Sequence, residues 1–373
     1  MKQQKKTCFL VSAFIAILVI LILLSLNSLE GYSDKIKIGV AMHLTGFGST
    51  WGENSRDGIL LAAKEINNAG GINGKKLEII FEDTQTEPNV AVNAANKLIN
   101  MDKVKIIVTG WSQETEAVSP LLKENKIIGI TVSGGSPNLT QGNAFLFRVW
   151  PSDGTQSKKI AEFANKKGYK KVAIIQTIGT WEEGVANVFR SEWKSLGNEI
   201  VLDYKILPDE MDFRSFIISI NNSDFIYLAL NSKSAGRFIK QYIESGGNLP
   251  LFYISDINDN TIIDGVSGIS NFEKIKIFYP VFKSPSEEFK SNFILEFNRT
   301  PGISADTAYD AIKIIKIILE KDNNANTESL REALYSVNYT GASGEISFNE
   351  DGDREKADVV IMTFKDGEFI KLE

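Results

Sequence analysis

Ser112 occupies a position that suits the binding of a small anionic group. It comes soon after the short apolar run Ile106–Thr109 and opens a helical pattern. The first turn of a helix presents backbone N–H groups without partners and the positive end of the helix dipole, so it favours a carboxylate. A serine at such a place can also cap its own helix without any ligand. The residues themselves leave both interpretations of Ser112 open.

Small and acidic residues follow other apolar runs. Ser133, Gly134 and Gly135 come after the run Ile127–Thr131, and a Gly-Gly turn is typical of backbone that needs positive φ. Asp256 follows a later run, and an ionised carboxylate in a partly closed site needs a cationic partner. The alternative for Asp256 is a cap on the turn that comes after it.

Two tryptophans, Trp51 and Trp181, stand in turn-like contexts, in the segments GSTWGEN and IGTWEEG. A large aromatic ring can clamp the apolar part of a ligand or sit over its cationic part. A tryptophan is also a common core residue, but the turn-like contexts favour exposure at a binding site. His43 is the one histidine of the sequence and ends the first predicted strand, where a buried or hinge position is expected.

The sequence offers little for catalysis or for metal binding. A Ser-His-Asp triad would need His43, and no nucleophile-elbow pattern accompanies it. Cys8 is the one cysteine and precedes the main body, which therefore has neither a thiol nor a Cys-His pair for zinc. The segment Gly71–Lys76 lacks the spacing and the Ser/Thr of a phosphate-binding loop. We expect a protein that is not an enzyme and that has no metal and no cofactor.

The elements that must position these residues alternate along the chain. Short β-branched runs are separated by longer helical patterns, which predicts an α/β fold with parallel sheets covered by helices on both faces. The expected strands are Ile36–Met42, Leu77–Glu82, Ile106–Thr109, Ile127–Thr131, Val172–Gln176, Phe225–Leu230, Leu251–Ile254 and Ile275–Phe278, and the expected helices include Glu53–Ala69, Asn89–Met101 and Gln156–Lys167. In such sheets ligands bind beyond the carboxyl ends of the strands.

A chain of 373 residues is long enough for two domains. The alternation pauses at Arg148–Asp153 and restarts at Gly154, so this segment is predicted to cross between two α/β lobes that can close on a ligand. The net charge is -6, and the sequence has no basic stripe with interleaved aromatics, so nucleic acid is not expected as a partner.

The sequence resembles the type I periplasmic solute-binding proteins, in the branch of the leucine/isoleucine/valine-binding proteins. The resemblance begins at Ile36–Gly46, IKIGVAMHLTG, and is most specific in AAKEINNAGGINGKKLEIIFED, which ends at Asp83. Shorter matches follow in order and include SQET, SPNLT, FRVWPSD, DFIYLAL, TAYDAI and GEISFNEDGD. The likeness covers nearly all of the chain after Asp34.

The resemblance implies roles for the candidate residues. A serine at the place of Ser112 holds the carboxylate of the ligand in this family, and an acidic residue at the place of Asp256 pairs with the ammonium. Family members often have Thr where this chain has Gly135, so that hydroxyl contact must come from the backbone, from water or from Ser133. Trp51 and Trp181 stand where Tyr is common. Asn231 also replaces a Tyr of the leucine-type binders, which implies an altered specificity.

The resemblance further implies two Rossmann-like lobes joined by a three-crossing hinge. Lobe 1 would hold residues 34–150 and 281–341, and lobe 2 would hold residues 151–280 and 342–373. The implied function is the extracytoplasmic substrate-binding component of an ABC transporter, which captures an amino acid, a branched-chain one in the named branch, or a similar solute as a monomer and delivers it to a membrane permease. Two alternatives stay open, a ligand-sensing receptor module of the same fold and a doubly wound enzyme.

The N-terminus has the features of an export signal. Lys2, Lys5 and Lys6 precede an uncharged stretch from Phe9 to Leu26, as a positive n-region precedes an apolar h-region. The stretch is about long enough to span a bilayer, and no A-x-A cleavage site stands out after it. Residues 1–33 are thus expected to be either a cleaved signal peptide or a membrane anchor, with the body outside the cytoplasm.

Overall fold

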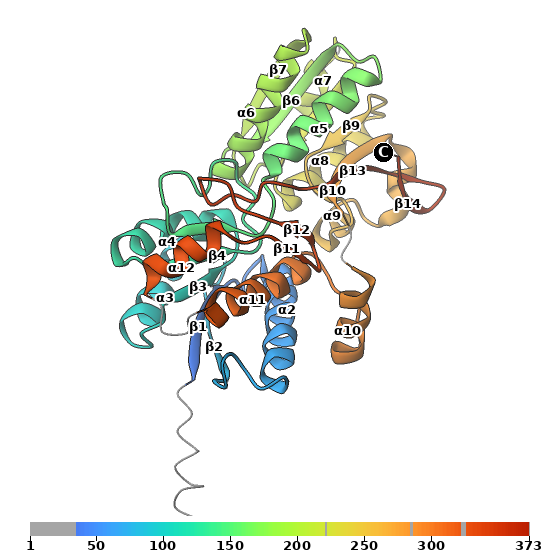
Figure 1. Ribbon diagram of the computed structural model, residues 1–373. Helices are drawn as coiled ribbons and strands as arrows, with labels where there is room; N and C mark the ends of the chain where they lie inside the picture. The colour runs from blue at the N-terminus through green and yellow to red at the C-terminus, as the bar shows by residue number, and fades with distance from the viewer. Residues whose placement is uncertain (1–34, 221, 284–285, 322–325, 373) are drawn as a thin grey trace, which may run out of the picture.

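The computed structural model describes residues 35–220, 222–283, 286–321 and 326–372 (Figure 1). The predicted leader, Phe9–Leu26, lies outside these ranges. Within them, none of the helices combines the length and the apolar character that crossing a bilayer would require.

The first sheet has five parallel strands in the order β2-β1-β3-β4-β5. Its central strands are buried on both faces, which explains why they read as continuous apolar runs rather than as an alternating pattern. The strands are β1 (Ile36–Met42), β2 (Leu77–Asp83), β3 (Ile106–Thr109), β4 (Ile128–Thr131) and β5 (Leu146–Arg148).

The second sheet has seven strands in the order β14-β13-β10-β9-β8-β6-β7. Five of them run parallel, and the two strands nearest the C-terminus, β13 and β14, add an antiparallel edge beside β10. The strands are β6 (Lys171–Thr177), β7 (Glu199–Ile206), β8 (Phe225–Ala229), β9 (Leu251–Tyr253), β10 (Ile277–Phe282), β13 (Val359–Lys365) and β14 (Glu368–Lys371). A separate hairpin pairs β11 (Tyr339–Gly341) with β12 (Gly344–Ile346).

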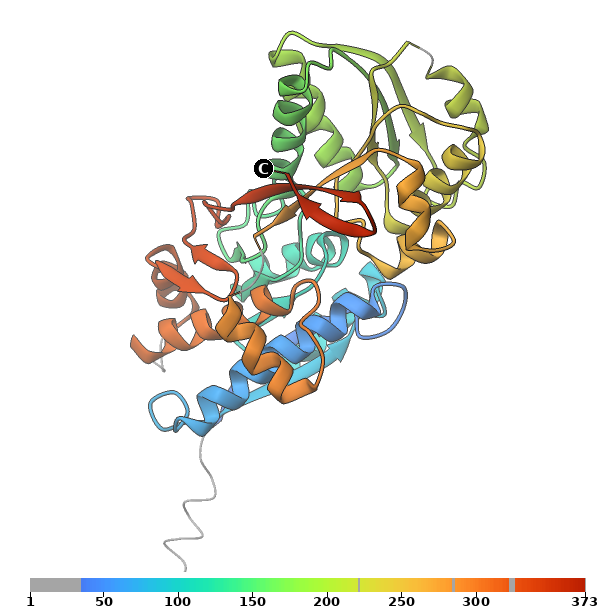
Figure 2. The ribbon, with the colours of Figure 1, turned by 90° about the vertical axis from the view of Figure 1, so that its right-hand side faces the viewer.

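Helices cover both faces of the first sheet, as the alternation predicts. α2 and α11 share one apolar core with the sheet, and α3 and α4 share another. Figure 1 shows these elements below and the second sheet with α5, α6 and α8 above, and Figure 2 shows the two groups from the side. The helices are α2 (Ser49–Asn68), α3 (Pro88–Asn100), α4 (Ser112–Asn125), α5 (Asp153–Lys166), α6 (Thr180–Ser195), α7 (Arg214–Ser219), α8 (Ser232–Glu244), α9 (Asn260–Gly265), α10 (Glu287–Phe297), α11 (Ala305–Lys321) and α12 (Thr327–Tyr335), with a 3-10 turn at Ile269–Lys274.

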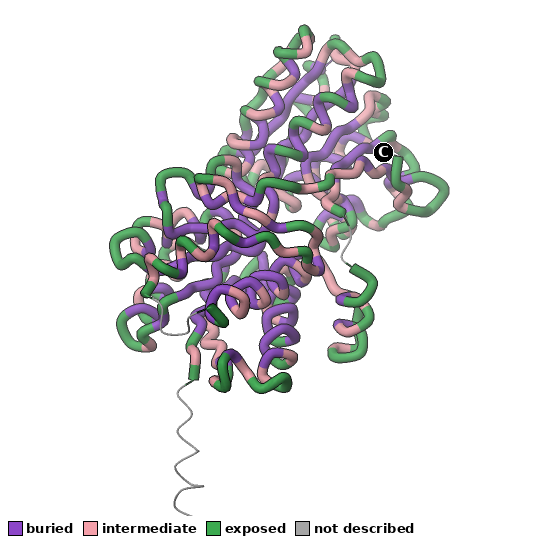
Figure 3. Tube along the Cα trace, viewed as in Figure 1, coloured by how far each residue is buried: buried purple, intermediate pink, exposed green. Residues whose placement is uncertain are grey.

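Each sheet has its own apolar core. The residues buried around the second sheet form one cluster that runs from Ile160 to Phe364, and the cores around the first sheet are separate clusters. Figure 3 shows the buried segments gathered in the interior of each group, with exposed segments around them. The predicted α/β fold with helix-flanked parallel sheets is confirmed.

The chain passes between the two sheets more than once. It leaves the first sheet after β5 and enters the second at α5, and it leaves the second after β10 for α10 and α11. After β12 it returns to the second sheet as β13. Ile346 and Phe348, just before that return, still pack in the core of the first sheet. The exact lobe boundaries that the resemblance implies stay a prediction.

Candidate functional site

The carboxyl ends of β3 and β4 bring the predicted residues Ser112 and Ser133–Gly135 to one edge of the first sheet. The Ser112 hydroxyl accepts a hydrogen bond from the Ser136 N–H at 2.9 Å, which ties the loop after β4 to the start of α4. The suggestion that Ser112 caps its own helix is wrong, because the N-cap residue is Trp111. The Glu114 carboxylate accepts from the Trp111 N–H at 3.2 Å and so satisfies the helix start instead.

Ser133 is the candidate whose side chain is left without a protein partner. Its hydroxyl is buried, and within the described part of the chain it makes no hydrogen bond. A buried hydroxyl without a partner is costly unless a ligand or water completes it. The loop around it is otherwise held firmly, because Gly134 donates its N–H to Thr131 Oγ1 at 3.1 Å and Arg148 donates to the Gly134 carbonyl at 3.3 Å.

Gly135 lies against the carboxylate of Asp153, a residue to which the sequence analysis assigned no role. A Cβ at position 135 would lie 1.8 Å from Asp153 Oδ2, so no larger residue fits beside Asp153. The Asp153 N–H donates to the Gly135 carbonyl at 2.9 Å. The place of the expected threonine side chain is thus taken by the first residue of α5.

Asp153 also accepts hydrogen bonds from two indole N–H groups. Trp150 Nε1 donates to Asp153 Oδ1 at 3.1 Å, and the predicted site residue Trp181 donates its Nε1 to Asp153 Oδ2 at 2.7 Å. The carboxylate is buried, and this burial raises its pKa while the two indole donors and Arg148 oppose the shift. Trp181 belongs to α6 and Gly135 to the loop after β4, so Asp153 links elements that pack around different sheets.

The other predicted tryptophan, Trp51, belongs to a chain of aromatic contacts. Its ring centroid lies 5.7 Å from that of Trp111, edge to face, and 5.8 Å from that of Trp150. All three indoles and that of Trp181 are half-buried, so each keeps part of its ring surface accessible. The prediction that Trp51 and Trp181 are more than core residues agrees with this partial exposure.

His43 serves the framework. It is buried, its Nδ1 lies 2.8 Å from Glu114 Oε2, and its ring packs 4.7 Å from that of Trp111. Thr84 donates its hydroxyl to the other oxygen of Glu114. His43 therefore anchors the start of α4, as expected of a buried histidine.

Asn231 and Asp256 lie at the carboxyl edge of the second sheet, after β8 and β9. Asn231 is the N-cap of α8 and accepts from the Ser234 N–H at 2.9 Å, so its side-chain oxygen has a structural partner. Asp256 accepts from the Asn258 N–H at 2.9 Å, which is the turn-capping alternative for one of its oxygens. Burial raises the pKa of Asp256 to about 6, and the nearby Asp259 adds to the shift.

Glu182 is a candidate that the sequence analysis missed. It is the third residue of α6, directly after Trp181, and its buried Oε2 has no hydrogen-bond partner among the described residues. Burial raises its pKa to about 7, and Glu183 contributes to the shift. Its charge acts on Tyr253 at the end of β9, so it lies toward the edge that also carries Asp256. The signal in the sequence was its place in the first turn of a helix that follows a strand end.

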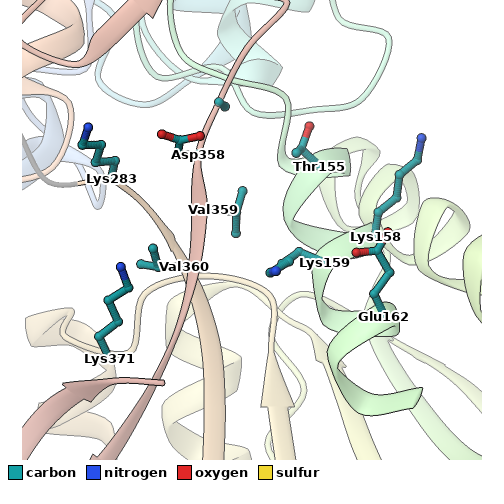
Figure 4. A pocket seen from close by; sticks show the side chains of 10 residues that line it. Thr155, Lys158, Lys159, Glu162, Lys283, Asp358, Val359, Val360 and Lys371 are labelled. Atoms are coloured by element: carbon teal, nitrogen blue, oxygen red, sulfur yellow. The ribbon is translucent and has the colours of Figure 1, made fainter. Parts of the chain in front are cut away.

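A cavity of about 570 Å³ opens elsewhere, between α5, the strands β13 and β14 and the segment just after β10 (Figure 4). Four lysines and two acidic residues are among its lining side chains: Lys158, Lys159, Lys283, Lys371, Glu162 and Asp358. None of the eight predicted site residues lines it. Over the described ranges, no group of His, Cys, Asp and Glu residues is arranged to hold a metal ion.

Comparison with known proteins places the chain in a family. Residues 35–368 match the family model described as periplasmic binding protein. The leucine-, isoleucine-, valine-, threonine- and alanine-binding protein of Pseudomonas aeruginosa is 26% identical over 336 residues, which cover 88% of this chain and 90% of that protein.

Solved structures agree with this match. The branched-chain amino acid transporter substrate-binding protein of Streptococcus pneumoniae, solved in complex with isoleucine, superposes with a TM-score of 0.79 at 25% identity over 91% of this chain and all of that chain. A leucine-binding protein of Thermotoga maritima gives a TM-score of 0.81 at 25% identity, over 91% of this chain and 98% of that one. The resemblance seen in the sequence is thereby confirmed: the chain belongs to the periplasmic binding protein family of extracytoplasmic solute-binding proteins.

Proposed function

We propose that this protein captures an amino acid, or a small zwitterion like it, outside the cytoplasm and delivers it to an ABC permease in the membrane. The observation that carries the proposal is the buried Ser133 hydroxyl without a partner among the described residues, in the loop that Ser136 ties to the start of α4. The relatives named above bind leucine, isoleucine, valine and other amino acids, and this chain matches them over most of its length.

The ligand carboxylate is assigned to the first edge. Ser133 donates its hydroxyl, Ser112 contributes its own hydroxyl, and the N-terminal turn of α4 contributes its dipole. The N–H of Gly135 completes this end, since the Gly134 N–H already donates to Thr131 Oγ1. The ammonium is assigned to Asp256, with Asn231 beside it and Trp51 and Trp181 around the rest of the solute. The protein acts as a monomer and catalyses no reaction on the solute.

Capture works through two states. A ligand that contacts residues around both sheets binds the closed arrangement better than the open one and shifts the equilibrium toward it. The shift also stabilises the fold, because the ligand binds the native state and not the unfolded chain.

A thermal-shift screen with the amino acids, short amides and related acids tests the proposal. We expect at least one zwitterion to raise the melting temperature in a concentration-dependent way. Ser133→Ala should weaken its binding by about tenfold, since one hydrogen bond to a charged group is worth about 1.5–3 kcal/mol. Ser219→Ala, on the exposed side of α7, is the matched control and should leave the affinity unchanged. No shift with any zwitterion would contradict the proposal.

Asp256→Ala is the test at the other edge. It should abolish the binding of a ligand with an ammonium group, because the carboxylate is its assigned counter-ion. Asp259→Ala removes a neighbouring carboxylate that caps α9 and is the control for a general loss of negative charge. Unchanged affinity in Asp256→Ala would remove Asp256 from the site.

A further inference from the structure

Asp153 and Gly135 form a matched pair. The carboxylate fills the space where a side chain at position 135 would begin, 1.8 Å from an ideal Cβ, and it is held there by its own N–H bond to the Gly135 carbonyl. A residue with any side chain at 135 would have to displace Asp153. This corner of the site therefore presents a carboxyl group where a hydroxyl would have offered a donor to a ligand carboxylate.

The indoles around Asp153 are oriented by it. Each of its oxygens accepts one indole N–H, from Trp150 at 3.1 Å and from Trp181 at 2.7 Å. The bonds fix the N–H edges of both rings on the carboxylate. Trp181 also packs against the core of the second sheet and Trp150 contacts the ring of Phe282, and each residue keeps part of its surface exposed. A negative partner at the N–H edge also makes the ring face more attractive to a cation. Trp51, 5.8 Å from Trp150, adds a third half-buried ring.

Among the residues that the structure describes, no ion pair joins Glu182 or Asp256 at the second edge to a basic side chain. The charged groups that act on Glu182 and Asp256 are Glu183 and Asp259, which are acidic themselves. Glu182 is 5% exposed and its Oε2 is buried. No hydrogen-bond donor among the described residues reaches that oxygen. Buried acids without a cation are the complement of a positively charged solute.

Building on the proposed function, we infer that the solute carries an alkylated ammonium head, as in a betaine, and that Asp153 is the positioning residue that holds the indoles around it. Indole faces attract a cation but accept no strong hydrogen bond, so they favour an ammonium without N–H donors over a primary one. The carboxylate of the same solute binds at Ser133 and the start of α4.

The experiment measures the affinities of N,N,N-trimethylglycine and leucine side by side, by calorimetry, on the full-length chain. We expect trimethylglycine to bind at least tenfold more tightly than leucine. Asp153→Asn keeps the shape but loses the charge and can accept from only one of the two indoles, so it should lower the affinity for trimethylglycine at least tenfold and leave that for leucine within about twofold. An equal loss for both ligands means that Asp153 is only structural and overturns the inference.

Two further variants keep the test decisive if Asp153→Asn folds poorly. Trp181→Phe retains a ring without the N–H, and should also reduce binding of trimethylglycine more than that of leucine. The double variant Gly135→Thr with Asp153→Ala restores room for the hydroxyl, and should reverse the preference toward leucine. Gly135→Thr alone should disrupt both.

The outcomes separate this inference from the proposed function. Tight binding of leucine by the parent chain without binding of trimethylglycine overturns the inference and leaves amino-acid capture intact. Failure of both ligands, together with failure of every zwitterion in the thermal screen, contradicts the proposed function itself.

Discussion

The buried side chain of Arg148 holds a loop of the candidate site in place. Its guanidinium is completely buried, makes a two-pronged ion pair with Asp353 and also donates to the carbonyls of Ser136 and Gly134. These bonds hold the loop that carries Ser133 and attach it to the segment near the C-terminus.

Arg148→Met should therefore lower the free energy of unfolding by about 3 kcal/mol, because it leaves Asp353 and two buried carbonyls without their partner. Urea denaturation measures the loss. Arg214→Met breaks an exposed pair with Asp212 and should leave the unfolding midpoint unchanged. A loss of the same size in both variants would contradict the role given to Arg148.

The acids at the second edge make ligand binding depend on pH. The folded-state pKa values of Asp256, about 6, and Glu182, about 7, lie above their unfolded values, so the folded chain binds protons more tightly between about pH 4 and pH 7. The free protein loses stability as the pH rises through that window, and a bound cation offsets the loss. The ligand-induced rise in melting temperature should thus grow from pH 5 to pH 7.5.

Thermal shifts at several pH values in that range check this expectation, with Glu182→Gln as the comparison. The amide has no charge to compensate, so the pH dependence of the shift should become shallower in this variant. A shift of constant size across the range in the parent chain would show that neither carboxylate responds to the ligand.

The candidate site was only partly visible in the sequence. Ser112, Ser133, Trp51 and Trp181 could be proposed from the sequence because they follow strand ends or stand in turns. Asp153 could not, because its partners Gly135 and Trp181 are brought to it by the fold and not by spacing along the chain. That Glu182 has no described basic partner could not be predicted either, because it depends on which residues the fold places around that side chain.

At the scale of elements, the end of α2 shows how glycine terminates a helix. The helix ends before Gly70 and Gly71: both have positive φ, and the Gly71 N–H returns to the Ile66 carbonyl at 2.9 Å. The turn that follows leads directly into β2 and so sets the register of the first sheet.

Gly71→Ala and Gly74→Ala form a matched pair. Both glycines have φ +80, but a Cβ at 71 would lie 2.2 Å from the Lys75 carbonyl oxygen, and at 74 it meets nothing within 4 Å. Gly74→Ala should cost only the backbone strain, about 1 kcal/mol, and Gly71→Ala clearly more. Unfolding midpoints give the comparison, and equal costs would show that the loop relaxes freely around position 71.

Strands with purely apolar runs were predictable, and the antiparallel edge was not. β1 and β3 have the bounds that the sequence predicts, and β4 differs by one residue. β13 and β14 were not expected. β13 pairs with β10, about eighty residues earlier in the chain, and no local pattern announces that pairing. The β13–β14 hairpin does have a local signal, the turn at Asp366 and Gly367, which the prediction overlooked.

At the scale of the whole molecule, the second sheet depends on the end of the chain. Ile361 and Phe364 of β13 belong to its core, and Thr363 donates its hydroxyl to the Ile277 carbonyl at 2.6 Å. Truncation after Lys356 removes these contacts and should cost at least about 3 kcal/mol, from two buried apolar side chains alone. It also exposes the edge of β10.

Truncation after Lys365 is the control, because it keeps β13 and removes β14. Hydrogen exchange should show lost protection in β8, β9 and β10 of the shorter chain and little change in β1 and β3. Equal loss across both sheets would mean that the two cores unfold as one unit.

This dependence has a consequence for biogenesis. A protein that acts outside the cytoplasm has to cross a membrane, and on a route that accepts only unfolded chains a core completed early would block the passage. Here the second sheet closes only when its last strands have been delivered, since the strand beside β10 comes from residues 359–365 of a chain of 373. The order of strands along the chain thus delays completion of the second core until residues 359–365 are available.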